Sequence, residues 1–284
     1  MAGNFVQLHN HTHYSLLDGA SKVPDLVKRV KELDMPAVGI TDHGNMHGAY
    51  ELWRAAVDSG VKPIIGIEAY VTPETARQDK TRVSWDTNWT PVPGHARNPD
   101  DVSGGGLITH LTMWAENDEG LVNLIKASSV ANLEGRVMRY PRMDKEVLST
   151  YSKGVIASSG CPSGIIQTRL RLGQFDEALR AAGEFQDIFG KDNFYIELMD
   201  HGLSIESKVT GDLLTIAKKL GAPLLATNDS HYVMEADKDA QDAMLCINSG
   251  ATLDDPNRFK FEGSGYYIKS AEEMRELFKG LRAR

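Results

Sequence analysis

The fold is decided by residues 37–71, which read AVGITDHGNMHGAYELWRAAVDSGVKPIIGIEAYV. Apolar, β-branched runs stand at both ends of this stretch, at residues 37–41 and 63–71. Between them, residues 49–59 carry apolar side chains at helical spacing. Two short strands joined by a helix form the βαβ unit of a parallel sheet, so the stretch predicts an α/β fold.

The same alternation continues on both sides of this unit. Further strands are predicted at residues 5–8, 107–115, 154–158, 194–199 and 223–227. Helices are predicted at residues 24–33, 119–131, 175–189, 205–220 and 236–248, and a last helix begins at Ser270, which forms a capping box with Glu273. About seven βα units in a row favour a barrel similar to the TIM barrel over an open sheet.

One segment interrupts the alternation. Residues 77–106 contain several prolines and the triple glycine 104–106, which is typical of a long surface excursion. We therefore predict a single domain over residues 1–284 with a surface insertion at about 77–106. His95 lies in this insertion, and we expect it to be exposed to solvent.

Composition limits the classes of function. Apolar residues make up 41% and charged residues 25%, which excludes disordered and collagen-like chains. The net charge of −8 excludes a broad basic surface for nucleic acid, so a pocket or metal ions must hold any phosphate-bearing substrate. The two cysteines are too few for a disulfide framework, and no apolar run is long enough to cross a membrane. We expect a cytoplasmic protein without a membrane partner.

Side chains that bind metals gather directly after the predicted strands, where α/β enzymes place their sites. His9 and His11 follow the first strand, and residues two apart in an extended chain face the same side. The later strands contribute His43, Glu68, His110, Cys161, Asp229 and His231.

Each of these residues alone has an ordinary structural explanation. His110 fits a hydrogen-bonded core histidine, Glu68 an ion-pair partner and Cys161 a small buried apolar residue. Together they place ligand-type side chains at most of the strand ends, which a polynuclear metal site explains at once. Imidazole, carboxylate and thiolate ligands suit zinc, manganese or iron, and their number favours two or three divalent ions.

A family resemblance rests on motifs along the whole chain: His9-Asn10-His11, residues 14–19, residues 41–46, residues 66–68, His110, residues 160–164 and residues 228–232. In this order they resemble the polymerase and histidinol phosphatase (PHP) domain family, and within it the domains that begin the alpha subunits of bacterial DNA polymerase III. The metal ligands that the resemblance implies are His9, His11, Asp18, His43, Glu68, His110, Cys161, Asp229 and His231. It also implies a distorted (βα)7 barrel with a trinuclear site at the carboxyl ends of its strands.

The resemblance further implies an activity. Family members with all nine ligands are associated with metal-dependent 3′-to-5′ exonuclease activity, which predicts proofreading of a DNA primer 3′ end. The implied partners are the remaining domains of the polymerase alpha subunit and other replisome subunits, whereas the polymerase carboxylates are missing from this chain. Asp42 and His201 lie beside ligand positions and are predicted to orient ligands or move protons.

Three alternatives stay open at this point. One is a small-molecule phosphatase of the same family, and another is a structural module that binds metal to stay folded. The third is a barrel amidohydrolase, which the absence of a lysine at the middle strand ends makes the weakest.

Overall fold

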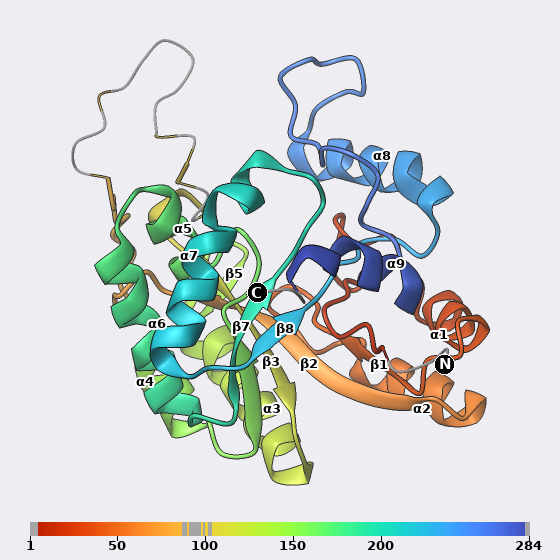
Figure 1. Ribbon diagram of the computed structural model, residues 1–284, viewed down its shortest axis with the longest axis horizontal. Helices are drawn as coiled ribbons and strands as arrows, with labels where there is room; N and C mark the ends of the chain where they lie inside the picture. Colours follow the sequence, from red (N-terminus) through yellow and green to blue (C-terminus); the bar gives the residue numbers. More distant parts are fainter. Residues whose placement is uncertain (1–4, 87–89, 91–97, 99, 102–103, 282–284) are drawn as a thin grey trace. The chain divides into compact units, whose positions relative to one another are not determined.

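The computed structural model describes residues 5–86, 90, 98, 100–101 and 104–281. The strands are β1 (Ala37–Ile40), β2 (Lys62–Val71), β3 (Thr109–Ala115), β4 (Arg136–Val137), β5 (Tyr140–Met143), β6 (Val155–Ser158), β7 (Phe194–Leu198) and β8 (Leu224–Ala226). The helices are α1 (Val23–Glu32), α2 (Ala49–Ser59), α3 (Asp118–Glu134), α4 (Lys145–Thr150), α5 (Ile165–Arg171), α6 (Phe175–Phe189), α7 (Ser204–Leu220), α8 (Lys238–Ser249) and α9 (Ala271–Leu277). Single 3₁₀ turns lie at Gly104–Gly106, Glu235–Asp237 and Lys279–Leu281. The predicted α/β class is confirmed (Figure 1).

None of the helices in the described ranges combines the length and apolar character that crossing a bilayer requires.

The chain divides into two compact units. Unit 1 contains the described residues of 1–67, 199–203 and 226–284, and unit 2 contains those of 68–198 and 204–225. The single domain over residues 1–284 stays a prediction, as does the insertion at 77–106. Much of that insertion, including His95, lies outside the described residues.

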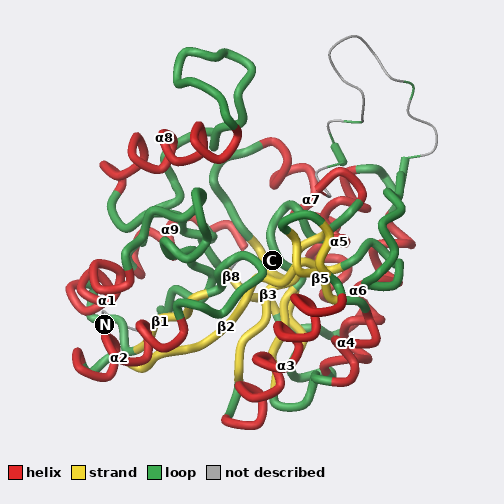
Figure 2. The backbone as a smooth tube through the Cα atoms, turned by 180° about the vertical axis from the view of Figure 1, so that it is seen from behind, coloured by secondary structure: helices red, strands yellow, loops and turns green. Residues whose placement is uncertain are grey.

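Unit 2 is built on a sheet whose strands follow the order β4-β5-β2-β3-β6-β7-β8. β2 pairs in parallel with β5 and β6 in parallel with β7, whereas β3 and β6 are antiparallel. Helix α3 packs against β3 and β5, and α7 packs against β7. Figure 2 shows the strands of this unit in yellow, with α3, α4 and α6 beside them. The sheet is rich in parallel pairs as predicted, and its closure into a barrel stays a prediction.

Unit 1 contains β1, which pairs in parallel with the first part of β2, so that Ala37 lies opposite Lys62. Helices α1 and α2 pack against each other. The apolar face predicted for α1 is buried, with Leu26, Val27 and Val30 in the core. At the other end of the chain, α9 begins after Ser270, and the predicted capping box with Glu273 is present.

The predicted strand at residues 5–8 is reduced to one parallel bridge between Gln7 and Val38. The side-chain amide of Asn10 donates to the carbonyl of Gln7 at 2.9 Å and to that of Gly39 at 2.8 Å. The Gln7 carbonyl also accepts from the backbone N–H of Gly39 at 2.8 Å, so main-chain and side-chain bonds together hold this segment beside β1. Gly39 permits the close approach, because a Cβ atom there would lie 2.6 Å from the Leu8 carbonyl oxygen.

Candidate metal centre

Residues 9–11 follow the first predicted strand and pair with two other segments of unit 1, at Thr41 and at Ser230. Asn10 accepts a hydrogen bond from the backbone of Thr41 at 2.9 Å, and His11 N–H donates to the Ser230 carbonyl at 2.7 Å. Ser230 in turn donates to the carbonyl of His9 at 3.1 Å. Because alternate residues of an extended chain face the same side, this pairing brings the odd-numbered side chains of 9–11 and 229–231 together.

The carboxylate of Asp229 lies at the centre of this arrangement. Its Oδ1 atom is 3.3 Å from His9 Nε2, 3.1 Å from His11 Nε2 and 3.6 Å from His231 Nδ1. Asp229 has a φ of +43°, in the left-handed region that non-glycine residues rarely adopt. Such a conformation at a buried carboxylate is typical of functional sites, where the surrounding contacts hold it in place.

A second carboxylate completes the group. Asp18 Oδ2 lies 2.8 Å from His43 Nε2 and 3.4 Å from His231 Nε2. The ring of His11 lies 4.1 Å from that of His43 and 4.3 Å from that of His231, measured between centroids. We call this group the histidine cluster; its members are His9, His11, Asp18, His43, Asp229 and His231.

Contacts within the histidine cluster shift the pKa of Asp18, Asp229 and His231. Burial raises the pKa of Asp18, but His231 and His43 outweigh burial and hold this pKa well below its usual range. Burial likewise raises the pKa of Asp229, and His9, His231 and His11 together lower it further than burial raises it. For His231, burial lowers the pKa while Asp18 and Asp229 raise it, with a net increase. Both carboxylates are therefore ionised and face the imidazoles.

Hydrogen bonds around the histidine cluster determine which imidazole nitrogen carries the proton. Ser15 Oγ donates to Asp42 Oδ1 at 2.8 Å, so its oxygen is left to accept from His11 Nδ1 at 2.9 Å. His231 Nδ1 lies 2.8 Å from the Asp229 carbonyl, which can only accept. In both rings Nδ1 carries the hydrogen, and the Nε2 lone pair points at a carboxylate oxygen.

A lone pair that faces a carboxylate needs a positive charge between them. At His231, in the absence of metal, a second proton on the imidazole supplies this charge, which agrees with the raised pKa of this residue. A divalent cation supplies it equally well. Ligand atoms of His11, His43 and His231 lie within 4.8 Å of one another, as do those of His9, His11 and Asp229. Imidazole and carboxylate donors in this arrangement fit a transition metal such as zinc, manganese or iron.

The two residues predicted to orient ligands differ in their positions. Asp42 accepts from Ser15 and from both the N–H and the hydroxyl of Thr12, so it reaches His11 through Ser15. His201 Nε2 lies 2.9 Å from the backbone carbonyl of Asn228, and its ring stacks on Tyr266 at 4.1 Å.

Sequence reasoning missed Ser15 and Asn228 as positioning residues. Ser15 follows His11 by four residues in a tight turn, a spacing that gives no periodic signal. The side-chain amide of Asn228 donates to the carbonyls of Gly265 and Tyr267, both at 2.8 Å, and this fixes the backbone next to Asp229. The sequence signal that could have found both residues is that each lies within a few residues of a predicted ligand.

The remaining three predicted ligands lie in unit 2, where His110 contacts the other two. His110 Nδ1 is 3.1 Å from Glu68 Oε1 and 3.4 Å from Cys161 Sγ. Glu68 is fully buried within β2, and Cys161 follows β6 in a turn whose Gly164 bridges to His110. Carboxylate, imidazole and thiol groups converge here as they do in zinc sites.

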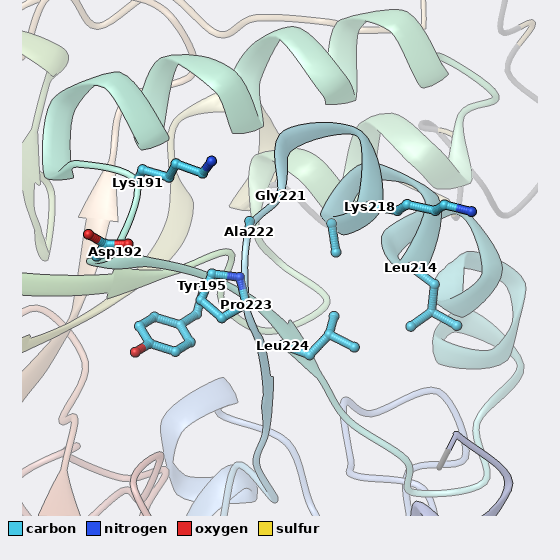
Figure 3. Close-up of a pocket in the computed structure, with 10 residues that line it drawn as sticks. Lys191, Asp192, Tyr195, Leu214, Lys218, Gly221, Ala222, Pro223 and Leu224 are labelled. Atoms are coloured by element: carbon cyan, nitrogen blue, oxygen red, sulfur yellow. The ribbon is translucent and has the colours of Figure 1, made fainter. Parts of the chain in front are cut away.

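A cavity of about 750 Å³ lies in unit 2, and none of the predicted site residues lines it. Lys191, Tyr195 and Leu224 are among the residues that line it (Figure 3). It therefore gives no support to a catalytic role.

Comparisons with known proteins identify related chains. A family model described as PHP domain matches residues 7–201. The DNA polymerase III subunit alpha of Mycobacterium leprae is 53% identical over 275 residues, which are 97% of this chain and 23% of that protein. The chain thus spans less than a quarter of the length of this curated relative.

Solved structures resemble the chain more distantly. An amidohydrolase from Chromobacterium violaceum, with bound sulfate and no metal, is 15% identical with a TM-score of 0.46, over 80% of this chain and 87% of that one. A two-domain protein from Bacteroides vulgatus containing a predicted PHP-like metal-dependent phosphoesterase is 12% identical with a TM-score of 0.42, over 96% of this chain and 61% of that one.

Proposed function

The chain belongs to the PHP domain family, and on this premise we propose that its histidine cluster is a divalent-metal centre that hydrolyses phosphodiester bonds at the 3′ end of a DNA strand. The observation that carries the proposal is that imidazole nitrogens and ionised carboxylates face one another in a group of six side chains. Four of the six are buried, and Asp18 and His43 are partly exposed. The similarity to a DNA polymerase III subunit alpha supports DNA as the substrate class.

His9, His11, His43 and His231 would hold two or three divalent ions together with Asp18 and Asp229. Bound divalent ions lower the pKa of water and neutralise the negative charge that develops on phosphoryl oxygens. The chain's own groups keep the imidazoles in the tautomer that exposes Nε2. Ser15 does this for His11, and the Asp229 carbonyl does it for His231.

Glu68, His110 and Cys161 are proposed as further ligands of the same kind. Their mutual contacts support this role, since a carboxylate, an imidazole and a thiol meet within 3.4 Å of His110 Nδ1. Asp42 is proposed to support His11 through Ser15, and His201 to support the backbone before Asp229 through the Asn228 carbonyl.

The proposal extends to partners. A DNA polymerase III subunit alpha that is more than four times as long as the matched region implies that further polymerase domains accompany this one. We propose those domains and other replisome subunits as partners, a DNA primer end as substrate and the cytoplasm as location.

The test combines metal analysis with a nuclease assay. Protein purified without chelator is analysed for metal content, and a primer with a 3′ mismatch is incubated with added manganese or zinc. We expect about two or three metal ions per chain and metal-dependent 3′ trimming. Asp229→Asn should lower metal content and reduce trimming by at least about 100-fold, because metal ions supply several kcal/mol of charge stabilisation.

The exposed Asp254 provides a matched control, since Asp254→Asn makes the same chemical change away from the histidine cluster. This variant should retain full activity. Hydrolysis of a small phosphomonoester without trimming would contradict the exonuclease and indicate a phosphatase. A metal-loaded protein without either activity, in which Asp229→Asn only lowers the melting temperature, would indicate a structural metal site.

A further inference from the structure

A row of aromatic rings leads outward from the histidine cluster. The ring of Phe261 meets His231 edge-on, with centroids 4.7 Å apart and an interplanar angle of 77°. Phe259 meets Phe261 in the same manner at 5.9 Å and 83°. Phe259 is 64% exposed, so the row ends at a side chain that is largely open to solvent. Figures 1 and 2 show the loop that follows α8 extending away from that helix.

The loop that carries these rings is attached to α8. Arg258 forms a two-pronged ion pair with Asp242, with nitrogen–oxygen distances of 2.5 and 2.6 Å. Arg258 Nε also donates to the Leu253 carbonyl at 3.2 Å, which ties the two sides of the loop together. A planar guanidinium in such a geometry is a firm anchor, so Phe259 is displayed from a defined position.

Charged groups surround a cavity of about 430 Å³ beside the same loop. Lys238 and Lys260 line it, and so do Asp239 and Glu262. These opposite charges balance, because Arg258 already neutralises Asp242. Phosphate binding alone therefore gives little affinity here, and an occupant must gain its affinity mainly from the aromatic ring.

We propose that residues 258–261 form a stacking platform for single-stranded DNA, in which Phe259 stacks on a base and Lys260 contacts the adjoining phosphate. Phe259 and Lys260 place an exposed aromatic ring next to an exposed cation, the combination with which proteins bind single strands without reading their sequence, while Arg258 and Phe261 hold them in position. Contact through Phe261 to His231 places the platform beside the histidine cluster. The platform rests on the proposed function, because it assigns the single strand whose end would be cleaved there.

The test measures binding separately from cleavage. Fluorescence polarisation of a 5′-labelled thymidine 12-mer is recorded against the protein in chelator, where no metal-dependent cleavage occurs. Loss of one stacked base corresponds to about a tenfold increase in Kd, so Phe259→Ala should weaken binding by that factor. Phe259→Trp, which keeps an aromatic face, should bind at least as tightly as the unmodified chain.

Leu253→Ala is the matched control, because Leu253 is 57% exposed on the same loop and lacks an aromatic ring. It should leave the Kd unchanged, as should a change of every thymidine to cytidine in the probe. Lys260→Gln should cost less than Phe259→Ala and lose its effect at high salt.

Equal Kd values for the unmodified chain and Phe259→Ala would overturn the platform, as would absence of any single-strand binding. If Phe259→Ala weakens binding but the unmodified chain never trims DNA, the platform stands and the proposed exonuclease fails. If the unmodified chain trims DNA and Phe259→Ala binds the strand equally tightly, the proposed exonuclease stands and the platform fails.

Discussion

Replacing Ser15 by alanine tests whether the hydrogen bonds around the histidine cluster prepare it for metal. The Ser15 hydroxyl makes three contacts: it donates to Asp42 Oδ1 at 2.8 Å and accepts from His11 Nδ1 at 2.9 Å and His43 N–H at 3.1 Å. Asp42 keeps its two hydrogen-bond donors from Thr12, so its carboxylate still has partners after the substitution. The His11 and His43 hydrogens lose their acceptor in a buried site.

The size of the effect follows from these contacts. Two buried donors without an acceptor cost about 1–3 kcal/mol each, so Ser15→Ala should lower the free energy of unfolding by about 2–6 kcal/mol. Without its Nδ1 acceptor, His11 is free to move its hydrogen to Nε2 and to rotate. Loss of such an orienting partner typically lowers metal affinity by about 10–100-fold.

The assay is titration calorimetry with manganese on metal-free protein, alongside urea denaturation in chelator. Ser21→Ala is the control, because Ser21 is also fully buried in unit 1 and its hydroxyl makes no hydrogen bond within the described residues. The control should bind metal normally. If Ser15→Ala binds manganese as tightly as Ser21→Ala, Ser15 does not set the His11 tautomer and the orientation argument is wrong.

Two further predictions concern unit 2. Arg142 is fully buried, and its guanidinium donates to four backbone carbonyls. Arg142→Met should therefore lower the free energy of unfolding, measured by urea denaturation, by about 3 kcal/mol. Arg142→Lys should not restore the lost stability, because an ammonium group cannot reproduce the geometry of the guanidinium. A second prediction concerns acid: burial raises the pKa of Glu74, but Arg180, Lys145 and Arg169 outweigh burial and lower it from 4.5. This ionised carboxylate therefore stabilises the fold above about pH 4.5, and the stabilisation is lost as the pH falls through the lowered pKa. Denaturation midpoints measured from pH 6 downward should fall less steeply in Arg180→Gln, and equal slopes would contradict this assignment.

The long, periodic elements of the fold were predictable because their own side chains determine them. The apolar face of α1 and the capping box at Ser270 are local patterns, and the structure contains both. The short strands β4 and β5 and the short helices α4 and α5 were missed. Segments of two to seven residues contain too little periodicity, and long-range pairing decides their form. The antiparallel pairing of β3 with β6 likewise depends on contacts that no single segment encodes.

The spacing of His9 and His11 predicted that their rings face one side, and the structure places both Nε2 atoms within 3.3 Å of Asp229 Oδ1. The supporting residues were less accessible to sequence reasoning. Ser15 and Asn228 act through hydrogen bonds that only the folded chain brings together, and any polar residue in a turn has the same local sequence pattern.

The C-terminal part of unit 1 is as necessary to the histidine cluster as the part that the family model matches. That match ends at residue 201, whereas Asp229 and His231 lie beyond it. The left-handed backbone of Asp229 costs about 1–2 kcal/mol, and its neighbours must hold it.

Asn228 provides this support through Gly265 and Tyr267, and Lys269 Nζ donates to Asn228 Oδ1 at 2.8 Å. The same segment carries Phe261 against His231. Residues 226–281 therefore contain two of the proposed ligands, the contacts that keep one of them in a strained conformation, and the proposed entry path for DNA. Because these roles share the same residues, loss of this segment would remove metal binding and strand binding together rather than one at a time.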